Sequence, residues 1–276
     1  MTLKNLTDLM ALDLALPVVP AAMARVIQAF DAPNPSTEVL ARDIADDPVL
    51  TMHLLRTANS AYFGLGRTVV TPLDAVRVLG FDKVRSLAIA MALKSCFHNI
   101  EERKLSAVWT ISLNAADVAM GIGNLIGVDR GTAYTAGLLH AVGMLVMTAA
   151  MPDAMRALDD LSHPMAPARV QLEQSHFGYS YAQAGAVLLR HWGLPTRFVE
   201  AVENQFAPLD NDHHEILAAV TCLAGWRARG EFCGLNDADM ATSYPDEVGL
   251  LLDLDPDMML AGIPGQRVRT TVLADD

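Results

Sequence analysis

The chain has 276 residues, of which 52% are hydrophobic and only 19% are charged, which is the composition of a compact globular protein and excludes a disordered one. Its formal net charge is −12, with 11 Lys and Arg against 11 Asp and Glu in residues 1–104, and 9 against 21 in residues 105–276. Because an acidic surface repels phosphate groups, we expect neither nucleic acid nor an anionic membrane as a general partner.

The compartment is indicated by the cysteines and by the apolar stretches. Three widely spaced cysteines without a Cys-x-x-Cys motif are typical of reduced thiols, and Asp8 and Asp13 interrupt the N-terminal stretch, which is unlike a secretory signal. The uncharged run over residues 131–152 has the length of a membrane span, but it contains three glycines and a histidine and lacks a flanking cluster of basic residues. We therefore expect a cytoplasmic protein that buries this run in its core.

Residues 1–104 carry helix signals and no strand-like alternation. Ser36, Asp47 and Thr71 are expected to cap helices, and the last two are each followed by a proline at the first helical position. In the helix after Asp47, residues at helical spacing predict a buried face formed by Val49, Met52, Leu55 and Ala58.

The pattern predicts an all-α protein built as a helical bundle of two subdomains. A charged junction at Glu101–Lys104 separates residues 1–104 from a second helical subdomain over residues 105–234. Residues 235–276 form an acidic C-terminal extension with 9 acidic residues and 2 arginines.

The middle of the second subdomain is an apolar stretch with one imidazole. Tyr134–Met147 has the pattern of a central core helix, and His140 is its only ionisable side chain apart from the phenol at its start. A buried polar ring needs a hydrogen-bond partner or a ligand. We expect a neighbouring hydroxyl or carbonyl to hold His140.

Several segments resemble, in order, those of HDOD domains, the HD-related output domains of bacterial signalling proteins. These segments read LPVVP, DPVLTMHLLRTANSAYFG, TPLDAVRVLGFDKVRSLAIAMAL, AGLLHAVG and GAVLLRHWGLP. The resemblance extends from about Leu16 to Pro208 and implies that the second subdomain is similar to the HD phosphohydrolases. It also implies partners among signalling proteins, such as those of cyclic di-GMP or two-component pathways.

The related phosphohydrolases hold a catalytic metal with His and Asp ligands. The resemblance places the corresponding positions at Ile111, His140, Ala141 and Gly225. Isoleucine, alanine and glycine side chains offer no metal ligand, and one imidazole alone gives negligible affinity. We therefore expect no metal, no cofactor and no catalysis, and a protein that acts through protein–protein contacts.

A second hypothesis is a small-molecule or nucleotide sensor that uses the old active-site cavity. The expected lining residues are Trp109, His140, Tyr181 and Gln205. Side chains of Ile111 and Phe206 that filled this cavity would count against the sensor.

A third hypothesis is residual metal-dependent phosphohydrolase activity. It would need ligands outside the family pattern, such as Glu173, Glu203 or His176.

The N-terminal half is the expected contact surface, because its balanced charge differs from the acidic second half. Arg56 and Arg85 are the basic residues that we expect to meet a charged partner. Asn59 is a further candidate, although its type also suits the C-terminus of a helix. The sequence specifies neither the partner nor an oligomeric state.

Overall fold

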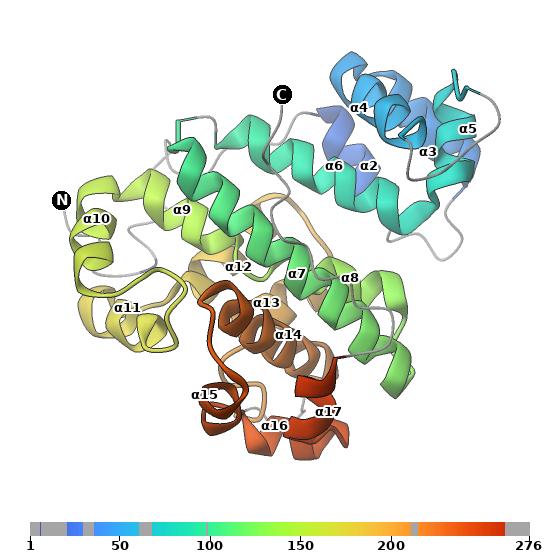
Figure 1. Cartoon of the computed structure of the whole chain (residues 1–276). Coiled ribbons are helices and arrows are strands. Elements are labelled where there is room, and N and C mark those ends of the chain that lie inside the picture. Colours follow the sequence, from blue (N-terminus) through green and yellow to red (C-terminus); the bar gives the residue numbers. More distant parts are fainter. Residues whose placement is uncertain are drawn as a thin grey trace. The chain divides into compact units, whose positions relative to one another are not determined.

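The computed structural model describes residue 6 and residues 21–29, 36–60, 68–97, 99–210 and 215–262, and these residues form helices and no strand. The helices are α2 (Ala21–Ala29), α3 (Thr37–Ala45), α4 (Pro48–Ala58), α5 (Pro72–Leu79), α6 (Phe81–Cys96), α7 (Glu102–Ile126), α8 (Arg130–Leu139), α9 (Val142–Ala150), α10 (Pro152–Leu161), α11 (Arg169–Phe177), α12 (Tyr181–His191), α13 (Thr196–Glu203), α14 (Ile216–Phe232), α15 (Asp237–Thr242), α16 (Asp246–Leu252) and α17 (Pro256–Ala261). The all-α prediction is confirmed (Figure 1).

The chain divides into two compact units. The smaller unit comprises residues 17–98 with residues 192–195, and the larger one comprises residues 1–16, 99–191 and 196–276. The expected boundary after Lys104 falls inside α7, which begins at Glu102.

Helix starts in the smaller unit follow the capping residues of the sequence. Ser36 Oγ accepts a hydrogen bond from the amide of residue 39 at 3.4 Å, and Thr71 Oγ1 accepts one from the amide of Asp74 at 3.1 Å. Asp47 Oδ1 accepts from the first two free amides of α4 at 2.9 and 3.0 Å. The three predicted caps are confirmed, and each satisfies amides that a helix N-terminus leaves unpaired.

The predicted buried face of α4 is wrong except at Ala58. The helix buries Leu50, Leu54 and Ala58, whereas Val49 and Met52 are 50% and 57% exposed. Residues 50, 54 and 58 lie four apart along one side of a helix, so the buried stripe starts one residue later than we expected.

The larger unit is built around α7, which packs along α8 and α14 (Figure 1). The contact between α7 and α8 is close because Gly137 faces the backbone of α7. A Cβ atom at Gly137 would lie 2.6 Å from the carbonyl oxygen of Ala115, which is too close for any side chain. Small residues thus allow the two helices to approach along their backbones.

The predicted core helix over Tyr134–Met147 is buried but broken. α8 ends at Leu139 and α9 starts at Val142, so His140 and Ala141 form a turn between two helices. Beyond the turn, α9 lies directly against α12, where a Cβ atom at Gly143 would come within 1.8 Å of the Tyr181 carbonyl oxygen. The sequence has neither proline nor a charged residue at this break, so no local signal predicted it.

Two apolar segments have the length and composition of membrane spans. They are Glu102–Ile126 and Arg130–Ala150. In the most apolar 18 residues of each segment, 67% and 83% of the residues, respectively, are buried inside the fold. Burial of this extent is typical of core helices, and the second segment contains the break at His140. Neither segment gives positive support for a membrane location.

The acidic extension forms α15, α16 and α17 in the larger unit. Tyr244 Oη donates to the carbonyl oxygen of Leu254 at 2.6 Å, and its ring meets that of Trp226 edge to face at 5.1 Å. Trp226 lies on α14 and donates through Nε1 to Ser243 Oγ at 3.2 Å. These contacts attach the extension to α14, and residues 263–276 lie outside the described residues.

Candidate functional site: the His140 cluster

His140 is fully buried in the turn between α8 and α9. Its Nδ1 lies 2.7 Å from the carbonyl oxygen of Gly137. Because a carbonyl oxygen only accepts, Nδ1 carries the proton, and Nε2 is a buried lone pair without a hydrogen-bond partner among the described residues. Burial, with a smaller contribution from the Arg229 guanidinium, lowers the pKa of His140 to about 3, so the imidazole is neutral.

Gly225 lies beside this imidazole, on α14. A Cβ atom there would be 3.2 Å from His140 Cδ2 and 3.0 Å from Arg229 Nη1. The position that the resemblance assigned to the distant metal-ligating aspartate is therefore next to His140. The guanidinium of Arg229, one helical turn later, takes up the space into which a side chain at residue 225 would extend.

Arg229 is held by two aromatic residues. Its Nη1 donates to Tyr181 Oη at 3.0 Å, and its Cζ lies 5.3 Å from the centre of the Phe206 ring. The rings of Tyr181 and Phe206 meet edge to face at 5.4 Å. A hydrogen bond and a cation–π contact thus fix a positive charge inside the larger unit.

Gln205, which follows the end of α13, is hydrogen-bonded to the backbone of His140. Its Nε2 donates to the carbonyl oxygens of His140 at 2.9 Å and Val202 at 2.8 Å, while Oε1 is buried without a hydrogen-bond partner in the described part of the chain. Tyr181 is fully buried at the start of α12, and burial raises its pKa to about 12. We call His140, Tyr181, Gln205, Gly225 and Arg229 the His140 cluster.

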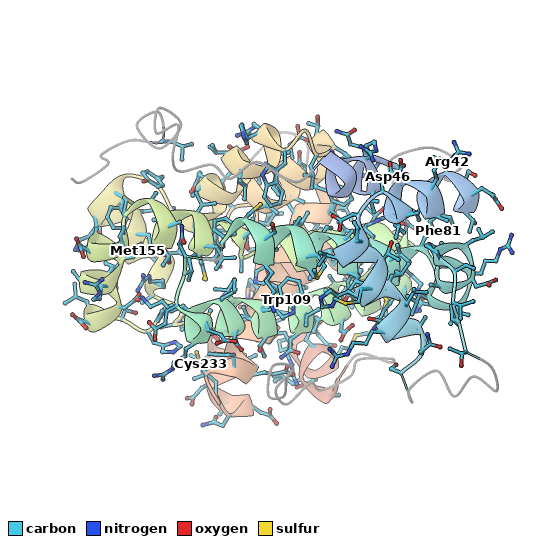
Figure 2. All side chains as sticks on the ribbon, turned by 90° about the horizontal axis from the view of Figure 1, so that it is seen from above. Arg42, Asp46, Phe81, Trp109, Met155 and Cys233 are labelled. Atoms are coloured by element: carbon cyan, nitrogen blue, oxygen red, sulfur yellow. The ribbon has the colours of Figure 1, made fainter. Side chains whose placement is uncertain are left out.

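The structure therefore brings together three of the four residues expected to line the old cavity. The fourth, Trp109, is half-buried on α7, and no hydrogen bond or ring contact joins it to the others within the described residues (Figure 2). Ile111, two residues later, is fully buried in the core. Arg229 was missed by the sequence analysis, and its position one turn after Gly225 was the only available signal.

The cluster does not fit the metal centre that the fold implies. Ile111, Ala141 and Gly225 have no donor atom, His140 offers one lone pair, and Arg229 adds a positive charge that repels a cation. Across the described part of the chain, no group of three or more His, Cys, Asp and Glu side chains could hold a metal ion.

The ligand set of the third hypothesis does not converge. Glu173 is buried and ion-paired with Arg169, at 3.1 Å between Oε1 and Nε. Glu203 instead pairs with Arg190, and His176 is exposed on α11.

The expected contact residues differ in what their side chains do. Arg56 is exposed at the end of α4 and makes no ion pair with another described residue. Asn59 uses its amide within the fold, because Oδ1 accepts from the Val69 amide and Nδ2 donates to the Val69 carbonyl, both at 2.7 Å. Arg85 is only 9% exposed, so the expectation of a surface contact there needs correction.

Comparison with known proteins defines the family. A family model described as the HDOD domain matches residues 16–208. The chain belongs to the HDOD family. An uncharacterised protein of Treponema pallidum (strain Nichols) is 22% identical over 189 residues, which make up 68% of this chain but only 37% of that protein.

Solved structures share the fold of this HDOD protein over most of its length. A candidate phosphohydrolase from Shewanella amazonensis SB2B has a TM-score of 0.73 and 25% identity, with 96% of each chain covered. An HDOD domain protein of unknown function from Geobacter sulfurreducens has a TM-score of 0.69 and 22% identity, with 89% of this chain and 88% of that one covered. A candidate signal transduction protein from Marinobacter aquaeolei VT8 has a TM-score of 0.74 and 24% identity, with 90% and 56% covered.

Proposed function

We propose that this HDOD protein is a non-catalytic regulatory protein that acts through contacts with other signalling proteins. The proposal is supported by the residues at the positions that would bind the metal of an HD phosphohydrolase, which are isoleucine, alanine and glycine alongside His140 in the family pattern. It agrees with the family and with the signalling role named for the Marinobacter relative.

One observation carries the proposal. The guanidinium of Arg229 lies 3.0 Å from the Cβ position of Gly225 and is held by Tyr181 and Phe206. A fixed cation beside a neutral His140 supplies internally the positive charge that a metal supplies in a hydrolase. It leaves no electrophile to activate water or to bind a phosphoryl oxygen.

The sensor hypothesis is less well supported at this place. Ile111 is fully buried, Phe206 packs on Tyr181, and Arg229 fills the space next to Gly225. The Phe206 and Arg229 side chains occupy space beside Tyr181 and Gly225 that a ligand of the old cavity would need.

The first experiment measures metal content and turnover of the purified full chain. We expect less than stoichiometric Mn, Fe and Zn by elemental analysis after incubation with each metal and desalting. We also expect no hydrolysis of p-nitrophenyl phosphate, bis-p-nitrophenyl phosphate or cyclic di-GMP above buffer. Tight metal binding together with turnover that His140→Ala abolishes would overturn the proposal.

A second experiment rebuilds the ligands. A triple variant combines Ile111→His, Ala141→Asp and Gly225→Asp, and a quadruple variant adds Arg229→Ala. We expect the quadruple variant to bind Mn²⁺ at least about tenfold more tightly than the triple one, because the guanidinium repels the cation at close range. Equal affinity of two folded variants would show that Arg229 does not stand in for the metal charge.

A further inference from the structure

The outward side of α4, in the smaller unit, is apolar. Val49 and Met52 are 50% and 57% exposed, and the exposed Arg56 follows on the same side, one turn after Met52. Residues at positions i, i+3 and i+7 share one face of a helix. The solvent side of a helix normally carries polar side chains, so two large apolar residues ahead of an arginine indicate a contact surface. We call Val49, Met52 and Arg56 the α4 face.

The charge on the α4 face is positive and uncompensated. The acidic side chains that precede it in the chain are already engaged, because Arg25 pairs with Asp43 at 3.2 Å and with Asp46 at 2.6 Å, and Asp47 caps α4. Arg56 makes no ion pair with another described residue. The α4 face therefore combines exposed apolar area with a cation that can meet a carboxylate of a partner.

The acidic extension carries the complementary character. Residues 235–262 include seven acidic residues and no Lys, Arg or His. Leu250 on α16 is 85% exposed, which makes it the most exposed large apolar side chain among the described residues. Asp246 and Glu247 are exposed one turn before it, on the same side of α16. We call Asp246, Glu247 and Leu250 the α16 face.

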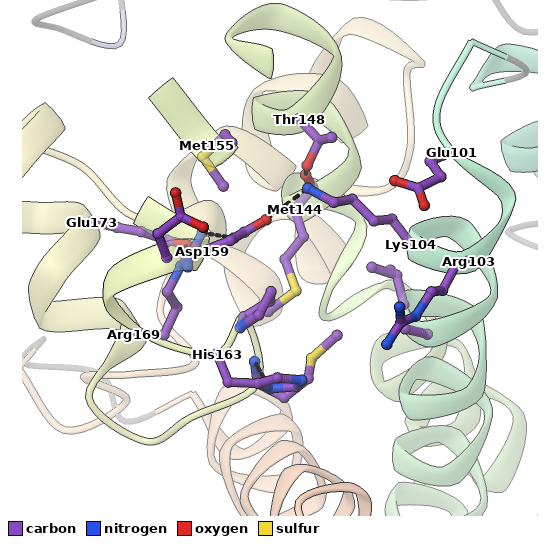
Figure 3. A pocket seen from close by; sticks show the side chains of 15 residues that line it. Glu101, Arg103, Lys104, Met144, Thr148, Met155, Asp159, His163, Arg169 and Glu173 are labelled. Carbon is purple, nitrogen blue, oxygen red and sulfur yellow. Dashed lines mark hydrogen bonds and ion pairs between the residues drawn. The ribbon is translucent and has the colours of Figure 1, made fainter. Parts of the chain in front are cut away.

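The charged wall of a pocket in the larger unit differs from the α16 face in this respect. The pocket of about 530 Å³ lies among α7, α9, α10 and α11 (Figure 3). Asp159 on its wall pairs with Lys104 at 2.7 Å and with Arg169 at 2.8 Å, and Arg169 also pairs with Glu173 at 3.1 Å. These charges compensate one another. The carboxylates of the α16 face make no ion pair with any described residue and keep their negative charge for a partner.

The two units differ in charge in the same sense as the two faces. The smaller unit, residues 17–98 with 192–195, has 8 Lys and Arg against 7 Asp and Glu, whereas the larger unit has 12 against 25. Two copies of the chain therefore repel each other through their larger units, and only unlike units avoid this repulsion. Exposed apolar side chains on both faces would leave water in the same contact.

We propose that the α4 face docks on the α16 face of a second copy of this chain. The apolar residues Val49 and Met52 cover Leu250, and Arg56 lies against the carboxylates that precede Leu250. Each copy carries both faces, so the contacts close into a symmetric dimer or a ring. This self-association uses neither the His140 cluster nor the pocket, and it does not depend on the loss of the metal site.

Analytical ultracentrifugation of the full chain tests the proposal. We expect the weight-average mass to rise above that of the monomer between about 5 and about 500 µM, the range in which small transient interfaces form. Because the charges on the two faces attract each other at the protein surface, about 0.5 M NaCl should weaken the association. A chain that stays monomeric over this range at low salt would overturn the proposal.

Variants of the exposed apolar residues locate the contact. Met52→Ser and Leu250→Ser should each weaken the association about tenfold, because each removes apolar area that the contact buries. Both side chains are exposed, so neither change should alter the melting temperature. Leu161→Ser is the matched control, because Leu161 is 67% exposed on α10, outside both faces, and it should leave the association unchanged. Unchanged association in Met52→Ser or in Leu250→Ser would exclude this pair of faces.

Charge reversals test whether unlike faces meet. Arg56→Glu and Glu247→Arg should each weaken self-association about tenfold. An equimolar mixture of the two variants should associate again, because the natural α4 face of one meets the natural α16 face of the other, and the reversed charges are again opposite in sign. If Glu247→Arg associated like the natural chain, or if the mixture associated no better than each variant alone, like faces would be paired and the proposal would be wrong.

Discussion

Arg229 donates to Tyr181 Oη at 3.0 Å, and this bond joins α14 to the start of α12 within the larger unit. The same guanidinium lies 3.0 Å from the position that a Cβ atom would take at Gly225, and it lies over the Phe206 ring. It contributes to the low pKa of His140. One arginine therefore places a positive charge beside positions that the resemblance assigns to metal ligands.

Replacing Arg229 should change the titration of His140. In Arg229→Met the pKa of His140 should rise above about 3, yet stay below 6.5, because burial is the larger cause of its depression. The measurement is an NMR titration of the imidazole. Arg190→Met, on the exposed end of α12, is the control and should leave the curve unchanged, and an unchanged curve in Arg229→Met would contradict the assignment.

Stability should depend on pH through His140. Folding lowers the pKa of His140 from 6.5 to about 3. Between about pH 3 and pH 6.5 the imidazole is therefore protonated in the unfolded chain and neutral in the folded chain. The stabilising contribution is complete above about pH 6.5 and is lost as the pH falls toward 3, at up to about 1.4 kcal/mol per pH unit.

Urea unfolding at pH 7.5 and pH 5 measures this dependence. The free energy of unfolding should fall less between the two values in His140→Gln than in the natural chain. His191→Gln removes an exposed imidazole and should behave like the natural chain. If the free energy of unfolding changed equally with pH in all three proteins, the pKa of His140 would not be lowered in the folded chain.

Glu173→Gln should destabilise the larger unit. The change leaves the 2% exposed Arg169 side chain with Asp159 as its only carboxylate partner, and we expect a loss of about 2 kcal/mol in the free energy of unfolding. Glu203→Gln is the matched control, because its partner Arg190 is 49% exposed. This substitution should lower the free energy of unfolding by less than about 1 kcal/mol. Equal losses in urea unfolding would argue against a special role for the buried pair.

Gly143→Ala should disrupt the contact between α9 and α12. Its Cβ would lie 1.8 Å from the Tyr181 carbonyl oxygen, and backbone cannot move aside as a side chain can. We expect a loss of about 3 kcal/mol or more, against about 1 kcal/mol for Gly185→Ala, whose Cβ would meet its neighbours at 3.2 Å or more. Thermal unfolding of both variants measures this difference, and similar melting temperatures would contradict it.

The partner surface is tested at Arg56. If the exposed face at the end of α4 meets an acidic partner, Arg56→Glu should weaken capture of that partner from lysate of the native host about tenfold. Arg156→Glu, an equal charge reversal in the larger unit, is the control and should leave capture of the partner unchanged. Equal capture by the two variants would place the contact elsewhere.

The sequence predicted features that depend on neighbours along the chain. The caps at Ser36, Asp47 and Thr71 follow from side chains that reach amides two or three residues away, and the all-α fold follows from helical periodicity. The buried stripe of α4 was misplaced by one residue because exposed Val49 and Met52 are as apolar as the buried leucines. Local pattern does not reveal which apolar side the neighbouring helices cover.

The family could likewise be recognised from the sequence alone, because it depends on residue identity in an ordered series of motifs. That the metal ligands are lost stays a prediction from the residues at the positions that the resemblance assigns to them. Only the tertiary structure decided which side chains lie beside those positions. Arg229 on α14 meets Tyr181 of α12 and Phe206, both distant in sequence, and the break at His140 is accompanied by close packing of α9 on α12. Such contacts are fixed by the fit between elements, which no single stretch of the chain encodes.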